Sequence, residues 1–346
     1  MKKLKSALQY LLMIAITGVL IWLSLRGLKL DGTHEGQSTA DLIWNAWTKS
    51  NKQYLIFMAV ILLISHVLRA ERWRMLLEPS GNKGTLSNSF LSVMVGYLVN
   101  LAIPRGGEVS RCYNLFKLEK TPVEVSFGTV VVERLVDVLC LLCLIMISFI
   151  VEWDKLEVFM AGLDFSQGTK PKVSPLLIIA VVGVAGLVVA IYMLRNNPRL
   201  RKLLTGFKEG LLAVFRLKNK WLFIGYSIII WALYFAMSYV VMLAFGETAG
   251  LGVRAVLTIF AIGAIAMAAP LPGGAGSYHL LLPMGLVSLY NMNRADAVAF
   301  VFIFHAWQTL VLIVVGIISL IISYWIIRGE NLRQNKIDGG SQKEGG

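Results

Sequence analysis

The stretch that decides the fold is NLAIPRGGEVSR, residues 100–111, and a shorter version of it, APLPGGAGSYH, occupies residues 269–279. Each places a proline and a Gly-Gly pair at the tip of an apolar segment. Proline has no backbone N–H to donate and glycine has a low helix preference, so a continuous membrane helix has to break at such a site. We therefore expect two helix breaks within the membrane region, which the rest of the chain holds in place.

The composition is that of an integral membrane protein. Of 346 residues, 57% are hydrophobic and only 15% are charged, which argues against a water-soluble globular protein of this size. Residues 86–103 and 253–290 are apolar but interrupted, and six other runs with almost no charge are mostly long enough to cross about 30 Å of hydrocarbon. The six runs are residues 7–25, 54–68, 127–151, 174–194, 221–245 and 297–327. The predicted fold class is an all-α, polytopic membrane protein with about six full spans.

The basic residues are distributed as in a membrane protein rather than a nucleic-acid-binding one. The formal net charge is +13. If residues 1–6, 69–85, 104–126, 195–220 and 328–346 lie in the cytoplasm, 23 Lys and Arg lie inside against 9 outside, whereas the acidic residues divide 9 and 9. This asymmetry follows the positive-inside rule. It predicts a multi-pass protein of a bacterial cytoplasmic membrane with both termini cytoplasmic and no nucleic-acid partner.

Two local features are better explained by membrane spans than by the classes they resemble. Lys2, Lys3 and Lys5 precede the first apolar run as in a signal peptide, but the run is longer than a signal h-region and no small-x-small cleavage site follows, so we interpret it as an uncleaved span. Cys140 and Cys143 form a CxxC pair inside an apolar helix without a nearby histidine, where they are expected to be small core residues. No disulfide framework, metal site or cofactor is expected.

The charge assignment makes both interrupted stretches re-entrant. Residues 69–85 and 104–126 lie on the same side, so the stretch between them has to enter from the cytoplasm, turn at residues 104–107 and return. By the same reasoning, residues 253–290 enter from the outside and turn at residues 272–274. Two opposed re-entrant helical hairpins are therefore predicted.

The order of elements repeats along the chain. Residues 1–165 and 166–328 both read span, span, hairpin, span, and they start on opposite sides of the membrane. Inverted repeats with broken helices near the midplane are typical of secondary transporters. The alternative is that the two halves have similar hydropathy by chance. The only sequence evidence against it is the likeness of residues 104–110 to residues 272–277.

One polar segment lies within the second half and another follows it. Residues 195–220 are basic with apolar residues on one helical face, which fits either an amphipathic helix on the cytoplasmic leaflet or an ordinary positive-inside loop. Residues 329–346 are polar and Gly-rich and are predicted to be a disordered cytoplasmic tail.

The strongest chemical signal is VVVERLVDVLCLL, which holds Glu133, Arg134 and Asp137 about two turns into an apolar helix. An unpaired charge at this depth costs several kcal/mol, so these side chains must pair or face water. Arg134 and Asp137 are spaced to pair on their own helix, and Glu133 shares a face with Asp137. The remaining negative charge has to be relieved by a proton, a cation or an arginine from elsewhere, with Arg105 and Arg111 as the natural candidates.

The first hairpin offers the groups that hold a phosphate. Arg105, Gly106, Gly107, Glu108 and Arg111 combine two guanidinium forks with the free N–H groups of a helix start. The predicted substrate-binding set is this group together with Glu133, Arg134 and Asp137. The alternative is a closed ion-pair network that only clips the hairpin to the following helix.

The second hairpin lacks such a cluster of charges. It offers Ser277, Tyr278 and His279, and the last helix offers His305 and Gln308, all mostly uncharged. A lone histidine in a helix bundle is more often a hydrogen-bonding core residue than a proton relay. We therefore predict a gate or a structural counterpart here, and the hairpin and gate residues are Pro104, Pro272, Gly273, Gly274, Ser277 and His279.

A basic and aromatic group, RAERWRMLLEP, follows the second span. Arg69, Arg72 and Trp73 could collect anionic lipid headgroups at the inner interface, but any cytoplasmic span end can have this composition.

Four motifs occur in an order that resembles a known family. RAERWRMLL, AIPRGGEVSR, VVVERLVDV and APLPGGAGSYH together resemble the lysylphosphatidylglycerol synthase transmembrane-region family, also called flippase-like, and are similar to the flippase portion of the bacterial multiple peptide resistance factor. The resemblance spans about residues 5–328 and implies a polytopic inner-membrane protein that moves lipids across the bilayer. The positions that match its motifs are Arg72, Trp73, Pro104, Gly107, Glu108, Arg111, Glu133, Arg134, Pro272, Gly273 and Gly274.

The sequence departs from the family pattern in two places. Bifunctional members carry a soluble domain that transfers lysine from a charged tRNA to phosphatidylglycerol, and about 19 residues after the last span are too few for it, so we do not expect synthase activity. The family also shows an acidic residue shortly after the second Gly-Gly, where residues 275–279 read AGSYH. We therefore do not expect the outer hairpin to have the same role as the inner one.

The sequence thus predicts a lipid transporter rather than an enzyme. Its substrate would be a phosphate-bearing lipid, with Arg105, Arg111 and Arg134 at the phosphate and the carboxylates orienting them or binding a coupling proton. No P-loop motif is present, so movement would be passive or coupled to a proton or cation. The predicted partners are anionic membrane lipids, a second copy of the chain or an envelope complex. The alternatives are an intramembrane lipid-modifying enzyme, without a clustered nucleophile to support it, and a non-transporting subunit of such a complex.

Overall fold

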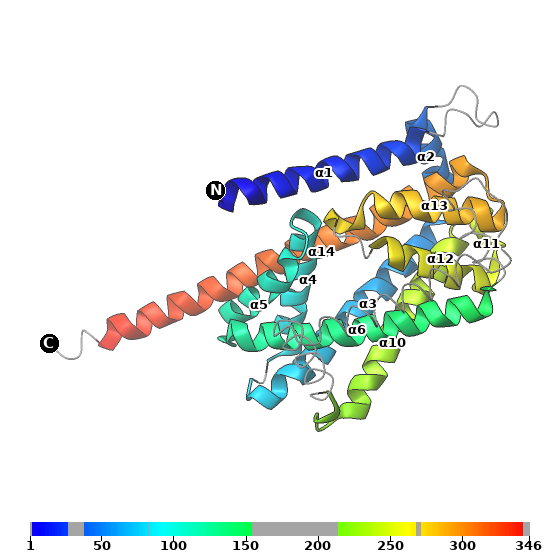
Figure 1. Cartoon of the computed structure of the whole chain (residues 1–346). Coiled ribbons are helices and arrows are strands. Elements are labelled where there is room, and N and C mark those ends of the chain that lie inside the picture. Colours follow the sequence, from blue (N-terminus) through cyan, green and yellow to red (C-terminus); the bar gives the residue numbers. More distant parts are fainter. Residues whose placement is uncertain (1, 27–37, 83, 154–213, 268–270, 342–346) are drawn as a thin grey trace.

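The computed structural model describes residues 2–26, 38–82, 84–153, 214–267 and 271–341 (Figure 1). The predicted span at residues 174–194 and most of the basic segment at residues 195–220 lie outside the described residues.

The described part of the chain contains helices and no strands. Every long helix corresponds to an apolar run of the sequence, which confirms the all-α class. The elements are α1 (Lys2–Arg26), α2 (Thr39–Lys49), α3 (Lys52–Leu77), η3 (Glu78–Ser80), α4 (Leu86–Ala102), α5 (Gly106–Glu119), α6 (Val123–Val151), α10 (Lys220–Leu243), α11 (Gly246–Ala249), α12 (Gly252–Met267), η4 (Pro272–Gly274), α13 (Ser277–Tyr290) and α14 (Arg294–Ser341).

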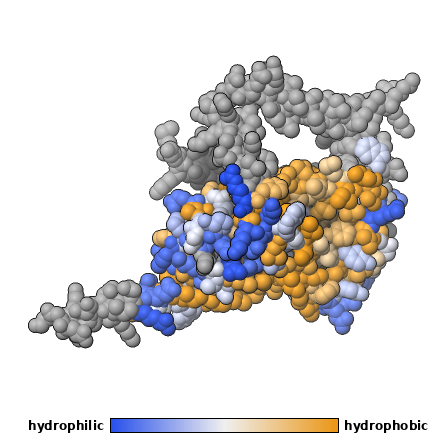
Figure 2. Space-filling model, turned by 90° about the horizontal axis from the view of Figure 1, so that it is seen from below, coloured by the Kyte–Doolittle hydropathy of each residue, from blue (hydrophilic) through white to orange (hydrophobic). Residues whose placement is uncertain are grey.

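Three of the described helical stretches are long and apolar enough to cross a membrane: Lys52–Ser80, Lys220–Leu243 and Arg294–Arg333. Shorter apolar helices occupy Met13–Leu25, Leu86–Ala102 and Gly252–Met267. The face seen in Figure 2 is largely hydrophobic, with hydrophilic surface gathered toward the ends of the molecule. An apolar surface of this extent is stable in lipid rather than in water. The chain is therefore a multi-pass membrane protein.

The helix break expected in the first hairpin lies between α4 and α5. Arg105 has a φ of 63°, a left-handed conformation that reverses the chain. The N–H of Gly107 donates to the side-chain oxygen of Asn100 at 2.8 Å. A Cβ at Gly107 would overlap the backbone oxygen of Gly96, so glycine is required where α4 and α5 cross.

The second break lies between α12 and α13, at η4. Gly273, Gly274 and Gly276 all have positive φ, between 57° and 93°. The hydroxyl of Ser277 donates to the carbonyl of Ala266 at 2.6 Å, which fixes the start of α13 to the end of α12. Both Gly-Gly sites therefore end one helix and begin the next, as the sequence predicts.

The two hairpins pack in a reciprocal pattern. Helix α3 packs along α10; α14, the last helix, packs on α4, the first arm of the first hairpin; and α6 packs on α12, the first arm of the second hairpin. Gly316 of α14 lies close to Leu98 of α4. The hairpin tips also meet, because η4 contacts α4 and Gly273 lies beside Leu101. Helix α1 covers α13 (Figure 1).

Helix α14 continues to Ser341, so residues 329–341 are helical where the sequence predicts a disordered tail (Figure 1). The physical reason is that a helix already formed by a membrane span extends without a new nucleation step, and no proline interrupts the polar residues that follow.

Candidate functional site

Glu133 lies at the centre of a buried group of charges. Its side chain is completely buried on α6, and its two oxygens are held by arginines from two other helices. Arg69 of α3 lies 2.6 Å from Oε1, Arg111 of α5 lies 2.8 Å from Oε2, and Arg72 of α3 lies 3.5 Å from Oε1. The carboxylate therefore ties the first hairpin to α3 and α6.

Asp137 completes the group one turn further along α6. Arg69 lies 2.9 Å from Oδ2 and Arg72 lies 2.7 Å from Oδ1. Helix α10 supplies neutral partners: Arg72 donates to the hydroxyl of Ser227 at 3.1 Å, and Arg69 donates twice to the hydroxyl of Tyr234, at 3.0 and 3.2 Å. We call Arg69, Arg72, Arg111, Glu133 and Asp137 the buried ion cluster.

The helical spacing explains how these side chains meet. Arg69 and Arg72 are three residues apart on α3, and Glu133 and Asp137 are four apart on α6, so each pair projects from one face. The aromatic ring of Trp73 lies 3.9 Å from the Arg111 guanidinium carbon and offers its face to the cation. The indole N–H of Trp73 donates to Thr129 at 2.9 Å and fixes the ring against α6.

The buried ion cluster carries an excess of positive charge. Three guanidinium groups face two carboxylates, so its formal charge is +1. The negative charge that Glu133 and Asp137 place on α6 is thus relieved by arginines from elsewhere, as expected for Arg111, and Arg69 and Arg72 of α3 more than complete the neutralisation. The Nε atoms of Arg72 and Arg111 are buried without a hydrogen-bond partner among the described residues. Unused buried donors and excess charge are costly unless an anion uses them.

A second ion pair lies at the edge of this group. Arg134 lies 3.0 Å from Glu108 of α5, with side chains 41% and 21% exposed. Arg134 therefore pairs with the hairpin, and the expected pair with Asp137 on its own helix does not form, because Arg69 and Arg72 occupy that carboxylate. We call Glu108 and Arg134 the rim pair.

The sequence predicts that Arg105 pairs with the carboxylates of α6, but it does not. It is exposed, it forms no ion pair with any described residue, and its left-handed backbone serves the turn. The N–H groups of Gly106 and Gly107 are also already used, by Ile103 and Asn100. In this conformation the start of α5 is closed by its own hairpin.

The sequence did not indicate that the arginines of α3 are buried in the site, or that α10 contributes polar side chains to it. It placed Arg69 and Arg72 at the surface, yet they are 3% and 0% exposed. Ser227 and Tyr234 are seven residues apart, so they share a face of an otherwise apolar helix. That spacing was the available signal for a polar contact across α10.

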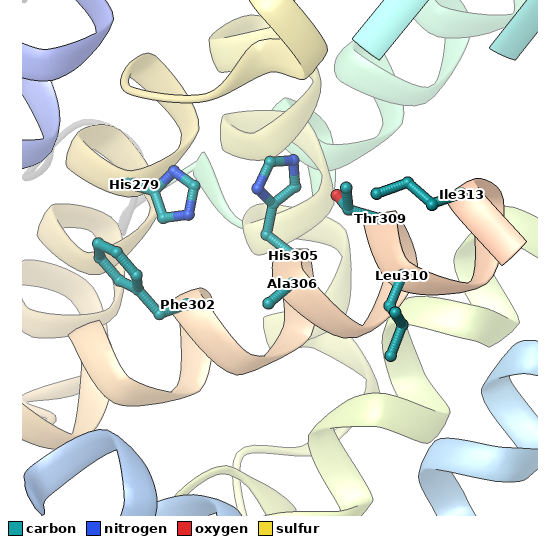
Figure 3. Close-up of a pocket in the computed structure, with 7 residues that line it drawn as sticks. All are labelled: His279, Phe302, His305, Ala306, Thr309, Leu310 and Ile313. Atoms are coloured by element: carbon teal, nitrogen blue, oxygen red, sulfur yellow. The ribbon is translucent and has the colours of Figure 1, made fainter. Parts of the chain in front are cut away.

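The second hairpin holds a smaller polar group. The Nε2 of His305 on α14 lies 3.0 Å from the carbonyl oxygen of Gly273, and its ring lies 4.8 Å from that of His279. Figure 3 shows the two imidazoles side by side at an open groove of about 350 Å³. The other groove residues are Phe302, Ala306, Thr309, Leu310 and Ile313. Across the described segments, no group of three or more His, Cys, Asp or Glu could hold a metal ion.

The comparison with protein families decides the relationship. The model for the lysylphosphatidylglycerol synthase TM region matches residues 10–316, which include both hairpins and the whole buried ion cluster. The chain belongs to this family. It is also 34% identical over 100 residues to UPF0104 membrane protein MJ1595 of Methanocaldococcus jannaschii. That match covers 28% of this chain and 30% of the relative's length. No solved structure matches the chain.

The family positions identified from the motifs fall into four places in the fold, one of which is the tip of the first hairpin with Pro104 and Gly107. Arg72, Arg111 and Glu133 meet in the buried ion cluster, with Trp73 stacked against it. The rim pair lies at its edge, and Pro272–Gly274 forms η4 at the tip of the second hairpin. The charged family positions therefore lie together around the first hairpin, on α3, α5 and α6.

Proposed function

We propose that this chain is a lipid transporter that moves a phosphate-bearing lipid, either a phospholipid or a polyprenyl-phosphate-linked lipid, across the cytoplasmic membrane. The observation that carries the proposal is the buried ion cluster, whose charge is +1 and whose Arg72 and Arg111 each keep an N–H that no described residue accepts. Membrane proteins rarely bury so many charges for packing alone. Guanidinium groups with spare donors are suited to a phosphate.

The proposed topology has two re-entrant hairpins in two inverted halves. Its support is the reciprocal packing, in which α14 packs on α4 while α6 packs on α12. The start of α1 and the end of α14 lie toward the same side in Figure 1, as two cytoplasmic termini require. In this arrangement the first hairpin opens to the cytoplasm and the second to the outside, and their tips meet between Leu101 and Gly273.

The rim pair is the proposed first contact for the headgroup. Arg134 is 41% exposed, so it can exchange Glu108 for a phosphate without a large desolvation cost. The exposed side chain of Arg105 lies on the same hairpin and adds positive charge to attract an anionic lipid. The acyl or prenyl chains stay in the surrounding lipid.

Entry into the cluster would release the hairpin. Arg111 is the member of the cluster that belongs to α5, and its pair with Glu133 is buried. Breaking a buried pair costs about 3–5 kcal/mol when one charge is left alone. A phosphate on Arg111 replaces the lost carboxylate, so headgroup binding and hairpin movement become linked.

The second hairpin is the proposed outer gate. His305 holds the carbonyl of Gly273, and the neighbouring groove offers two imidazoles in an otherwise apolar setting. A bond from a neutral imidazole is weaker than an ion pair, so this tip opens more easily than the inner one.

The test is movement of labelled phosphatidylglycerol in vesicles that contain the purified chain. Glu133→Gln and Arg134→Ala are expected to lower the initial rate at least about tenfold, a change of about 1.4 kcal/mol. Glu71→Gln is the matched control, since Glu71 pairs with Arg74 on α3 outside the cluster at 2.6 Å. If Glu133→Gln and Arg134→Ala both moved lipid at the rate of the parent, the assignment of this site would be refuted.

A further inference from the structure

His66 is a buried imidazole that the proposed site does not use. It lies on α3, about 21 Å along a helix about 38 Å long, one turn before Arg69. It is 3% exposed, and neither ring nitrogen has a hydrogen-bond partner among the described residues. A buried imidazole normally uses at least one nitrogen, so this one requires an explanation.

The surroundings of His66 are polar on one side. The ring of Tyr97 on α4 stacks on it, with centroids 4.4 Å apart. Arg69 follows on the same face of α3 and connects to Tyr234 of α10 and to both carboxylates of α6. Helix α14, which also contacts α3, carries no Asp, Glu, Lys or Arg between Asp296 and Arg328. The charges that face His66 are therefore those of the buried ion cluster.

The carboxylates of the cluster are poor sites for a coupling proton. Glu133 is within 3.5 Å of three arginines and Asp137 within 2.9 Å of two, so protonating either one would leave guanidinium groups uncompensated. Protonating His66 breaks no such pair, because neither of its ring nitrogens has a hydrogen-bond partner in the part of the chain that the structure describes. A proton carried with the lipid would more readily bind the imidazole than either carboxylate.

We propose that His66 binds the coupling proton, and that it does so when the phosphate of a lipid headgroup occupies the neighbouring arginines; this rests on the proposed transport function. Without an anion, a proton on His66 adds positive charge beside a cluster that already carries +1, which Coulomb repulsion opposes. A phosphate reverses the local charge and favours the proton. By linkage, the proton strengthens phosphate binding to the same extent.

The direct test is proton uptake on headgroup binding. The full chain in neutral detergent and weak buffer is mixed with short-chain phosphatidylglycerol, and a pH indicator follows the free proton concentration. The parent is expected to take up as much as one proton per chain. Its affinity for the lipid should rise as the pH falls, by no more than about tenfold per pH unit, the limit for one linked proton.

Two variants separate the proton site from a packing role. His66→Phe keeps a ring against Tyr97, and His66→Gln keeps a polar group; both should bind the lipid without proton uptake and with an affinity independent of pH. If the parent took up no proton, the proposal would be overturned. It would also be overturned if either variant took up protons as the parent does. Binding and transport are measured separately, so uptake that depends on His66 without lipid movement would refute the transport function alone.

Discussion

Arg111 of the first hairpin and Glu133 of α6 lie 2.8 Å apart, and neither side chain is more than 4% exposed. This pair connects the first hairpin to the rest of the bundle across a buried, low-dielectric contact. Because its charges belong to a cluster of net charge +1, the two residues are not equivalent. Removing the carboxylate and removing the guanidinium should have different consequences.

Glu133→Gln is expected to destabilise the chain more than Arg111→Gln. The first change leaves three arginines against Asp137 and raises the formal charge of the cluster to +2, whereas the second leaves it neutral. We expect losses of about 3–5 kcal/mol for Glu133→Gln and about 1–3 kcal/mol for Arg111→Gln. Unfolding of the purified variants followed by circular dichroism measures both. If Arg111→Gln were the less stable variant, the excess positive charge of the cluster would not be what determines its contribution to stability.

Gly107→Ala should disrupt the first hairpin. A methyl group at this position would overlap the backbone of Gly96 and push α4 and α5 apart. Gly128→Ala is the matched control, because nothing lies within 4 Å of a Cβ placed there, and a glycine-to-alanine change in an open helix position stabilises by up to about 1 kcal/mol. Thermal unfolding should therefore shift down for Gly107→Ala and remain equal or rise for Gly128→Ala. A Gly107→Ala chain of parental stability would contradict the close helix crossing.

Arg134→Ala should separate stability from lipid binding. The rim pair is partly exposed, so its loss should change the free energy of unfolding by less than about 1 kcal/mol. Binding of phosphatidylglycerol should nevertheless weaken, and the residual binding should depend less on salt than in the parent, because one attractive charge is gone. A variant with unchanged salt dependence would show that Arg134 does not meet the headgroup.

Joining the hairpin tips should stop lipid movement reversibly. A side chain at Gly273 would lie 3.3 Å from Leu101, so cysteines at these positions in a chain without Cys112, Cys140 and Cys143 can be linked by a short thiol crosslinker with a reducible bond. The transport rate should fall on crosslinking and recover on reduction. The same treatment of the chain carrying only Leu101→Cys is the control. Undiminished transport by a fully crosslinked chain would show that the tips do not need to separate.

The sequence predicted the breaks well because proline and glycine act locally. Residues 104–107 and 272–274 end and restart helices where their backbone chemistry requires it. Helix α2 could also have been found, since Ser38 and Asp41 form a capping box at its start. The helical extension of α14 to Ser341 was missed, because composition alone does not show that a preceding span nucleates it.

The site was only partly predictable. The charges at Glu133 and Asp137 signalled a buried pairing, and Arg111 was correctly assigned to it. Periodicity gives the face of a helix but not the helix that it meets, so the arginines of α3 could not be placed. Tyr234 lies 165 residues from Arg69 in the chain, and that contact exists only in the folded bundle.

The central claim, that the buried ion cluster receives a lipid phosphate, is tested most directly by native mass spectrometry of the lipid retained by the purified chain. The parent should retain phosphate-bearing lipids above their proportion in the host membrane, and Arg111→Gln, which removes one of the guanidinium groups, should lose that enrichment while Glu71→Gln keeps it. The same enrichment in the parent and in Arg111→Gln, or none in the parent, would contradict the claim.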